Sequence, residues 1–180
     1  MRSFAETRAT NARALSAFGV HASGHGAATR LIRQGSSVKL YTIGYEKRDI
    51  DELLSLLRDQ GVKLLADVRQ RPLSRKPEFR GNALREACNA AGIAYQGWPG
   101  LGSTAQQREE LHETGDFSKF ATQFRALAEQ TMTDDLARLA EVVRDTPTVL
   151  LCYEREHTEC HRSIIADMLG QQINATVVAI

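Results

Sequence analysis

Apolar and polar residues follow one another along most of the chain in blocks that predict strands and helices in turn. Short runs of apolar and β-branched residues, each of which predicts a strand, occur at 39–43, 62–66, 93–95, 148–152 and 175–180. Helices are predicted between them, over about 50–60, 82–91, 105–113, 116–130, 134–144 and 163–169. This alternation indicates an α/β fold, a three-layer domain with a mostly parallel sheet of about five strands flanked by helices.

The first predicted helix has the clearest boundaries. Asp49 and Glu52 have the spacing of a capping box, and Gly61 stands where a helix C-terminal cap belongs. Because this helix connects the strands at 39–43 and 62–66, the two strands are expected to be parallel, with a right-handed crossover.

Residues 1–38 differ from the rest of the chain. They are rich in Ala, Arg, Ser and Gly, with Glu6 as the one acidic residue. We expect an N-terminal extension that is weakly ordered or forms a short helix, followed by the α/β domain at 39–180. The segment has no apolar centre of the secretory type, although its composition also fits an organellar transit peptide.

Composition narrows the classes of function. The net charge of +1 gives no general attraction to nucleic acids or membranes, so any basic surface must be local. No apolar run approaches the roughly 20 residues that span a bilayer, so we expect no membrane partner. Three cysteines do not suggest a disulfide framework, which favours a reducing, cytoplasmic location.

Polar residues come directly after four of the predicted strands. Gly44, Asp67 with Arg69, Trp98, and the segment 152–162 each follow a strand. Ligands of open parallel sheets bind beyond the carboxyl ends of the strands. The sequence therefore predicts a site where these four loops meet.

The segment 152–162 carries most of the reactive side chains. Cys160 and His161 lie at the predicted start of the last long helix, where the helix dipole stabilises a thiolate, and Arg162 follows them. Cys160 as a packing residue, and Arg162 as a structural partner of Asp67 or Glu154, are the alternatives. Cys152 closes a buried strand and is better explained by packing than as a nucleophile.

Two further chemistries remain open. Cys152, His157, Cys160 and His161 supply enough soft ligands for zinc, but their spacing is not a standard one, so no metal or other cofactor is assigned. The loop at 69–80 is basic and suits phosphate or a nucleic-acid backbone, unless it is only a solvated surface. Trp98 is either a base-stacking residue or part of the core.

These pieces together resemble the DUF488 family over about 41–180. The matching residues are Thr42-Ile-Gly44, Asp67-Val-Arg69, Pro72-x-Ser-Arg75 with Phe79, Pro99-x-Leu-Gly102, and Leu151-Cys152-x-Glu154 followed by Cys160-His161-Arg162. The resemblance implies an α/β domain with a polar site at the strand ends, and it implies no particular reaction. The family usually has His-Ser after the first glycine, where this chain has Tyr45-Glu46, so no role of that histidine carries over.

Our leading hypothesis is a small cytoplasmic enzyme or ligand-binding protein with a site for phosphate, a nucleotide or nucleic acid. The residues expected to hold the anion are Arg69, Arg75, Arg162 and Gly44. Those expected to carry chemistry are Asp67, Glu154 and His161 for proton transfer and Cys160, or else Cys152, as a thiol nucleophile or redox group. The first alternative is a non-catalytic nucleic-acid-binding module using the Arg69–Arg80 loop, and the second is a structural metal-binding domain. The sequence does not fix the oligomeric state.

Overall fold

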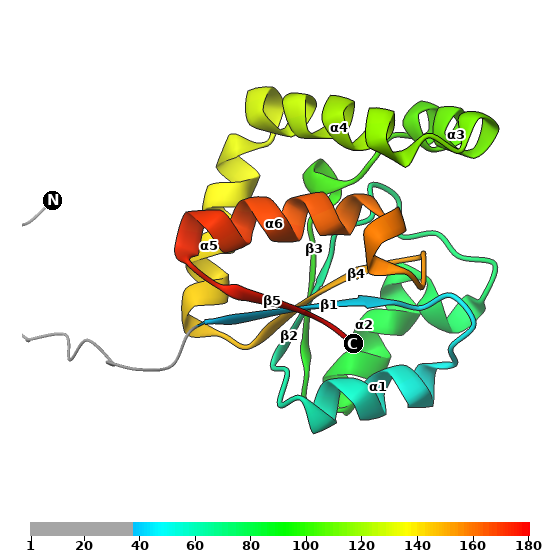
Figure 1. The fold of residues 1–180 in the computed structure, drawn as a ribbon. Coiled ribbons are helices and arrows are strands. Elements are labelled where there is room, and N and C mark those ends of the chain that lie inside the picture. Colours follow the sequence, from blue (N-terminus) through cyan, green and yellow to red (C-terminus); the bar gives the residue numbers. More distant parts are fainter. Residues whose placement is uncertain (1–37) are drawn as a thin grey trace, which may run out of the picture. The chain divides into compact units, whose positions relative to one another are not determined.

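The computed structural model of the protein describes residues 38–180, which form five strands and six α-helices (Figure 1). The strands are β1 (Lys39–Gly44), β2 (Leu64–Asp67), β3 (Ala94–Gly97), β4 (Thr148–Cys152) and β5 (Thr176–Ala179). The α-helices are α1 (Ile50–Asp59), α2 (Gly81–Ala90), α3 (Ala105–Thr114), α4 (Phe117–Thr131), α5 (Thr133–Asp145) and α6 (His161–Ile173). Single 3-10 turns lie at η1 (Pro77–Phe79), η2 (Pro99–Leu101) and η3 (His157–Glu159). The extension expected at 1–38 lies outside the described residues apart from its last position.

The sheet is wholly parallel, with strand order β3-β2-β4-β1-β5. The predicted three-layer α/β fold is therefore confirmed. The strands end nearly level, because Gly44 is the register partner of Cys152 and Asp67 is that of both Leu151 and Gly97. The loops that follow these strands consequently start side by side at one edge.

Helices cover both faces of the sheet, and the helix that follows β4 covers a different face from the helices that follow β1 and β2. Residues of α1 and α2 pack with Ile43, Leu65 and Leu151 on one face. Residues of α4, α5 and α6 pack with Leu40 and Leu150 on the other. The chain leaves β1 and β2 towards the face covered by α1 and α2, and it leaves β4, which lies between them, towards the opposite face. Such switch points open crevices at the carboxyl edge of a parallel sheet.

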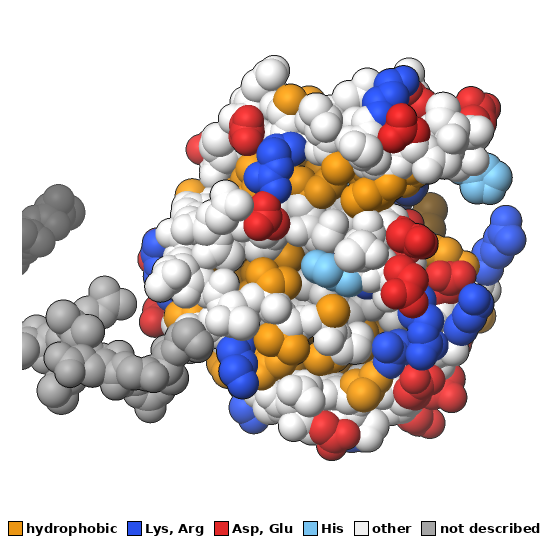
Figure 2. Space-filling model, viewed as in Figure 1, with side chains coloured by type: hydrophobic (Ala, Val, Ile, Leu, Met, Phe, Trp, Pro, Cys, Tyr) orange, Lys and Arg blue, Asp and Glu red, His pale blue; other side chains and the backbone are white. Residues whose placement is uncertain are grey.

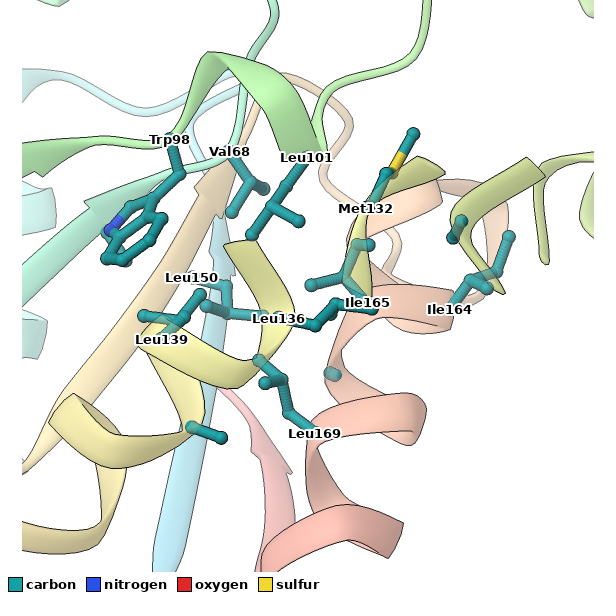
Figure 3. Close-up of a cluster of buried hydrophobic side chains, with 14 of the residues drawn as sticks. Val68, Trp98, Leu101, Met132, Leu136, Leu139, Leu150, Ile164, Ile165 and Leu169 are labelled. Atoms are coloured by element: carbon teal, nitrogen blue, oxygen red, sulfur yellow. The ribbon is translucent and has the colours of Figure 1, made fainter. Parts of the chain in front are cut away.

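Both faces of the central strand are buried, which explains its unbroken apolar sequence. All five residues of β4 are buried. Leu150 lies in the core beneath α5 and α6, near Leu139 and Ile165 (Figure 3). Trp98 belongs to the same core and is 6% exposed. Its indole therefore presents no open face to a ligand.

The first helix begins as its sequence predicts. The carboxylate of Asp49 accepts a hydrogen bond of 2.8 Å from the amide of Glu52, which satisfies one of the free amides of the first turn. Gly61, just beyond the helix, has a φ of +67°, in the left-handed region that favours glycine.

Within residues 38–180, no helix has the length and apolar content that crossing a membrane requires.

Candidate functional site

A cavity of about 680 Å³ lies at the carboxyl edge of the sheet, where the loops after β1, β2, β3 and β4 meet α3. This volume falls in the range of small-molecule sites, about 300–1,000 Å³. Its lining residues are Tyr45, Arg69, Gln70, Arg71, Leu73, Ser74, Arg75, Lys76, Ser103, Arg108, His112, Cys152, Tyr153, Glu154 and His161. In Figure 2, charged side chains gather on the right of the molecule, the side to which β1 points in Figure 1.

Positive charge predominates around the cavity. Five of its lining residues are arginine or lysine, namely Arg69, Arg71, Arg75, Lys76 and Arg108. Glu154 is the one carboxylate among the described lining residues. A concave surface with this imbalance concentrates anions, because the low-dielectric walls focus the field of the cations into the cavity.

Arg69 forms the fixed wall of the cavity. Its Nε and Nη2 donate to the two carboxylate oxygens of Asp67 at 2.8 and 2.5 Å. Its Nη1 donates to the hydroxyl of Tyr45 at 3.1 Å and to the carbonyl of Phe79 at 3.0 Å. Burial opposes the charged form, but the hydrogen bonds and the charge of Asp67 outweigh it and raise the pKa of Arg69. The guanidinium is therefore permanently charged and held in one orientation.

Asp67 lies behind this wall and does not line the cavity. The carboxylate is 1% exposed, and it also accepts a hydrogen bond of 2.7 Å from the hydroxyl of Tyr95. Burial, together with the negative charge of Asp67, raises the pKa of the Tyr95 hydroxyl, so this donor keeps its proton at neutral pH. The contacts of Asp67 orient Arg69, and its carboxylate has no open side for proton transfer to a ligand.

The other cations that line the cavity differ in whether their side chains form hydrogen bonds within the protein. Lys76 donates to the carbonyl of Arg48 at 2.5 Å, and Arg108 of α3 donates to the carbonyl of Ser103. Arg71 and Arg75 are exposed, and neither forms a hydrogen bond or ion pair within residues 38–180. These two guanidinium groups are consequently available to a ligand.

Two thiols and a carboxylate meet at the floor of the cavity. The Sγ atoms of Cys152 and Cys160 lie 3.1 and 2.8 Å from the same oxygen, Oε2 of Glu154, and donate to it. Although burial works in the opposite direction, the bonds from these thiols lower the pKa of Glu154. Burial and the adjacent Cys152 raise the pKa of Cys160 well above its ordinary value. This direction is opposite to the depressed pKa expected for Cys160 at a helix N-terminus, because burial disfavours the thiolate.

His161 completes this group. Its Nε2 lies 3.0 Å from the carbonyl oxygen of Val68, which can only accept, so Nε2 carries a proton. Its Nδ1 lies 3.6 Å from Sγ of Cys152 and 3.7 Å from Sγ of Cys160. Burial opposes the charged ring, but Cys160 and the Val68 carbonyl raise the pKa of His161. In the neutral ring, the lone pair of Nδ1 points towards both sulfurs.

Gly44 and Arg162 shape the loop that carries Glu154. A Cβ added to Gly44 would lie 1.8 Å from the carbonyl oxygen of Glu154, so only glycine allows this approach. Arg162 is 1% exposed and donates to the carbonyls of Glu154 and Arg155 at 2.5 and 3.0 Å. Its partners are thus two backbone carbonyls, and neither the carboxylate of Asp67 nor that of Glu154 pairs with it.

The structure divides the predicted site residues into two groups. Those that line the cavity are Arg69, Arg75, Glu154 and His161, joined by Cys152. Those outside its lining are Gly44, Asp67, Cys160 and Arg162. Cys160 contacts the floor from behind and is 2% exposed.

The group of potential metal ligands differs from the one the sequence indicates. Ligand atoms of Cys152, Glu154, Cys160 and His161 all lie within 4.8 Å of one another. His157 is not among them, because its Nδ1 forms a hydrogen bond of 2.9 Å with the hydroxyl of Thr42. Cys88 lies in the core of the face covered by α1 and α2.

Three residues that line the cavity have no role predicted from the sequence. Tyr45 stacks on Phe79 with ring centroids 4.4 Å apart and binds Arg69. Tyr153 is 48% exposed at the cavity. Arg108 comes from α3, a helix without buried residues. This lack of a buried face is the one feature of the sequence that could have indicated a functional role for the helix.

Comparison with known proteins returned one family. The family model described as "Domain of unknown function DUF488" matches residues 49–169. The match includes all the residues of the site except Gly44 and Tyr45. No curated protein and no solved structure matches the chain.

Proposed function

The chain belongs to the DUF488 family, and we propose that it binds a phosphorylated small molecule of nucleotide size in the cavity at the strand ends. The observation that carries this proposal is the excess of positive charge in the cavity. Among the described residues, five arginine and lysine side chains line its volume of about 680 Å³, whereas Glu154 is the single carboxylate that does so. Phosphate is the ligand class that such a surface suits, since it accepts several charge-assisted hydrogen bonds at once.

Arg71 and Arg75 are the residues that contact the phosphate groups in this proposal. Both are exposed at the cavity, and a guanidinium presents a planar pair of donors that matches a phosphate oxygen pair. Arg69 contributes charge from its fixed position, while Asp67 and Tyr95 act as positioning residues behind it. Arg162 and Gly44, assigned to anion binding by the sequence, instead hold the loop of Glu154.

The rim adds a surface for a base. Tyr153 lines the cavity and is 48% exposed, and Leu73, which also lines the cavity, is 73% exposed. Stacking of a base on an aromatic ring contributes about 1–3 kcal/mol. An aromatic ring next to free arginines favours a nucleotide over inorganic phosphate.

In the enzymatic form of the proposal, the floor supplies the reactive groups. Cys152 lines the cavity, and its Sγ lies 3.6 Å from Nδ1 of His161, which is the base that a thiol nucleophile needs. Glu154 is the second group available for proton transfer. Cys160 is the weaker candidate for nucleophile because it lies outside the lining and burial raises its pKa.

The competing hypothesis, a nucleic-acid-binding module, uses the same arginines and adds Trp98 for stacking. Trp98 is buried in the core, so it supplies no stacking surface. Binding of an oligonucleotide through the loop alone would depend steeply on salt and would not require the cavity.

Isothermal titration calorimetry with ADP and pyrophosphate, on protein treated with a chelator, tests the proposal. We expect both ligands to bind, and the double variant Arg71→Ala/Arg75→Ala to bind each at least about tenfold more weakly, equivalent to about 1.4 kcal/mol. The matched control is Arg58→Ala/Arg144→Ala, which removes the same charge from α1 and α5 away from the cavity. Equal weakening by both double variants, or no binding by the wild type, would overturn it.

A single-stranded oligonucleotide is the third ligand of this experiment. Oligonucleotide binding by the wild type, without ADP or pyrophosphate binding, would support the nucleic-acid module and contradict the nucleotide site.

A further inference from the structure

We propose that Cys152, Glu154, Cys160 and His161 bind one transition-metal ion, with Zn²⁺ the best match. Thiolate and imidazole ligands select zinc and its neighbours over magnesium or calcium, which prefer oxygen. The four residues supply two sulfurs, one nitrogen and one carboxylate oxygen within 4.8 Å of one another. This proposal does not depend on nucleotide binding by Arg71 and Arg75, and it gives Cys152, Glu154 and His161 the role of metal ligands in place of the roles of nucleophile and proton-transfer groups.

The distances between the ligand atoms fit a tetrahedral site. Zinc lies about 2.3 Å from sulfur and about 2.0–2.1 Å from nitrogen, so two such ligands at a tetrahedral angle are about 3.6 Å apart. Nδ1 of His161 lies 3.6 and 3.7 Å from the sulfurs of Cys152 and Cys160. Oε2 of Glu154 lies closer to them, at 3.1 and 2.8 Å, so this carboxylate would move back by about 0.5–0.8 Å to admit the ion.

The histidine is already oriented as a ligand. Its Nε2–H donates to the Val68 carbonyl at 3.0 Å, which leaves Nδ1 free to face the sulfurs. Metal-binding histidines commonly donate their second ring nitrogen to a carbonyl or carboxylate, which fixes the tautomer and the ring.

The carboxylate of Glu154 has no cation of its own. Its side-chain hydrogen-bond donors are the two thiols, and among residues 38–180 no arginine or lysine side chain pairs with it. Thiols are weak donors, and a partly buried carboxylate with only such partners is costly. A divalent ion at this point would compensate the charge of Glu154.

The backbone holds the four residues in place without the ion. Cys152 ends β4 and Cys160 caps α6, so both sulfurs are attached to regular elements. Gly44 and Arg162 fix the loop between them. Because Cys152, Glu154 and His161 line the cavity, the ion would lie at its floor.

A disulfide between Cys152 and Cys160 is the alternative use of the two thiols. A disulfide would not explain why Glu154 and His161 both lie beside the two sulfurs. A metal site accounts for all four residues. The two are distinguished by whether the reduced protein binds an ion.

The test is a titration of the reduced, chelator-treated full-length protein with Co²⁺, followed by visible absorption spectroscopy. We expect a single tetrahedral ion per chain, with a sulfur-to-cobalt charge-transfer band that Zn²⁺ abolishes by displacement. Cys152→Ala, Cys160→Ala and Glu154→Gln should each weaken Co²⁺ binding at least about tenfold. Cys88→Ala and His157→Gln are the matched controls and should keep the wild-type spectrum. Circular dichroism shows which variants are folded, and Glu154→Gln, which keeps the shape of the side chain, decides the matter if a cysteine variant unfolds.

Absence of the charge-transfer band in the reduced wild-type protein would overturn the metal site. So would a spectrum that survives in folded Cys152→Ala or Glu154→Gln protein, or one that His157→Gln removes. Since ADP and pyrophosphate binding are measured without metal, failure of this proposal leaves that result unchanged.

Discussion

Asp67 and Arg69, two residues apart at the end of β2, form a buried two-pronged ion pair whose nitrogen–oxygen distances are 2.8 and 2.5 Å. The pair turns Arg69 across the cavity towards Tyr45. It converts a residue that is ordinarily mobile into part of a rigid wall.

Replacing Asp67 with Asn should strongly destabilise the protein. The change leaves the buried charge of Arg69 uncompensated, which costs about 3–5 kcal/mol in comparable cases. Chemical denaturation measures the free energy of unfolding. The control is Asp167→Asn, which breaks the exposed pair with Arg125 and should cost less than about 1 kcal/mol. If both variants lose a similar amount of unfolding free energy, the buried pair stabilises the protein no more than the exposed one.

Tyr95→Phe should destabilise the protein by about 1–2 kcal/mol at neutral pH, because it removes a hydrogen bond to a charged carboxylate. The dependence on pH follows from the raised pKa of Tyr95 in the folded state. The hydroxyl of Tyr95 contributes its full stabilisation below a pH of about 10, the pKa of tyrosine in the unfolded chain. This contribution is lost as the pH rises above that value. The difference between wild type and variant should therefore shrink above pH ~10. A difference that grows with pH would contradict this assignment.

Gly44→Ala should distort the loop of Glu154. The new Cβ would meet the Glu154 carbonyl, a backbone atom that cannot rotate away, and overpacking of this kind costs about 1–3 kcal/mol. Thermal denaturation measures the loss. Gly97→Ala, at the end of β3, is the control, because its Cβ would meet no atom within 4 Å. If both variants melt at the wild-type temperature, the backbone of Gly44 does not lie as close to the Glu154 carbonyl as described.

Tyr153→Ala should weaken ADP binding while leaving pyrophosphate binding unchanged. Loss of one base-stacking contact corresponds to about 1–3 kcal/mol, or roughly 5–150-fold in affinity. Calorimetry with the two ligands separates the base from the phosphates. Tyr153→Phe keeps the ring and should bind both ligands as the wild type does. Equal weakening of both ligands by Tyr153→Ala would instead show that the substitution disturbs the cavity as a whole.

The arrangement of strands and helices could be predicted because burial leaves a periodic pattern in the sequence. β1, β2 and β4 are buried along nearly their whole length, and each contains a run of apolar and β-branched residues. β3 was less well placed, at 93–95 instead of Ala94–Gly97, because this edge strand is largely exposed and lacks such a run. The apolar pattern of the last helix begins only at 163, because His161 and Arg162 are polar residues that the fold buries, but α6 begins at His161, the expected start of this helix.

The position of the site could be predicted from parallel topology, but the roles of its residues could not. Arg69, Arg75, Glu154 and His161 line one cavity because the carboxyl ends of parallel strands share an edge. The partners of Arg162 are backbone carbonyls, which leave no signal in a sequence. The approach of Arg108 to the basic loop depends on how α3 packs, a contact between distant segments that no local pattern encodes.

Nucleotide binding in the cavity at the strand ends can be tested with a crystal structure of the protein bound to ADP. We expect electron density for the diphosphate within hydrogen-bonding distance of Arg71 and Arg75, and density for the adenine against the ring of Tyr153. An empty cavity at saturating ADP, or a nucleotide bound elsewhere on the surface, would contradict it.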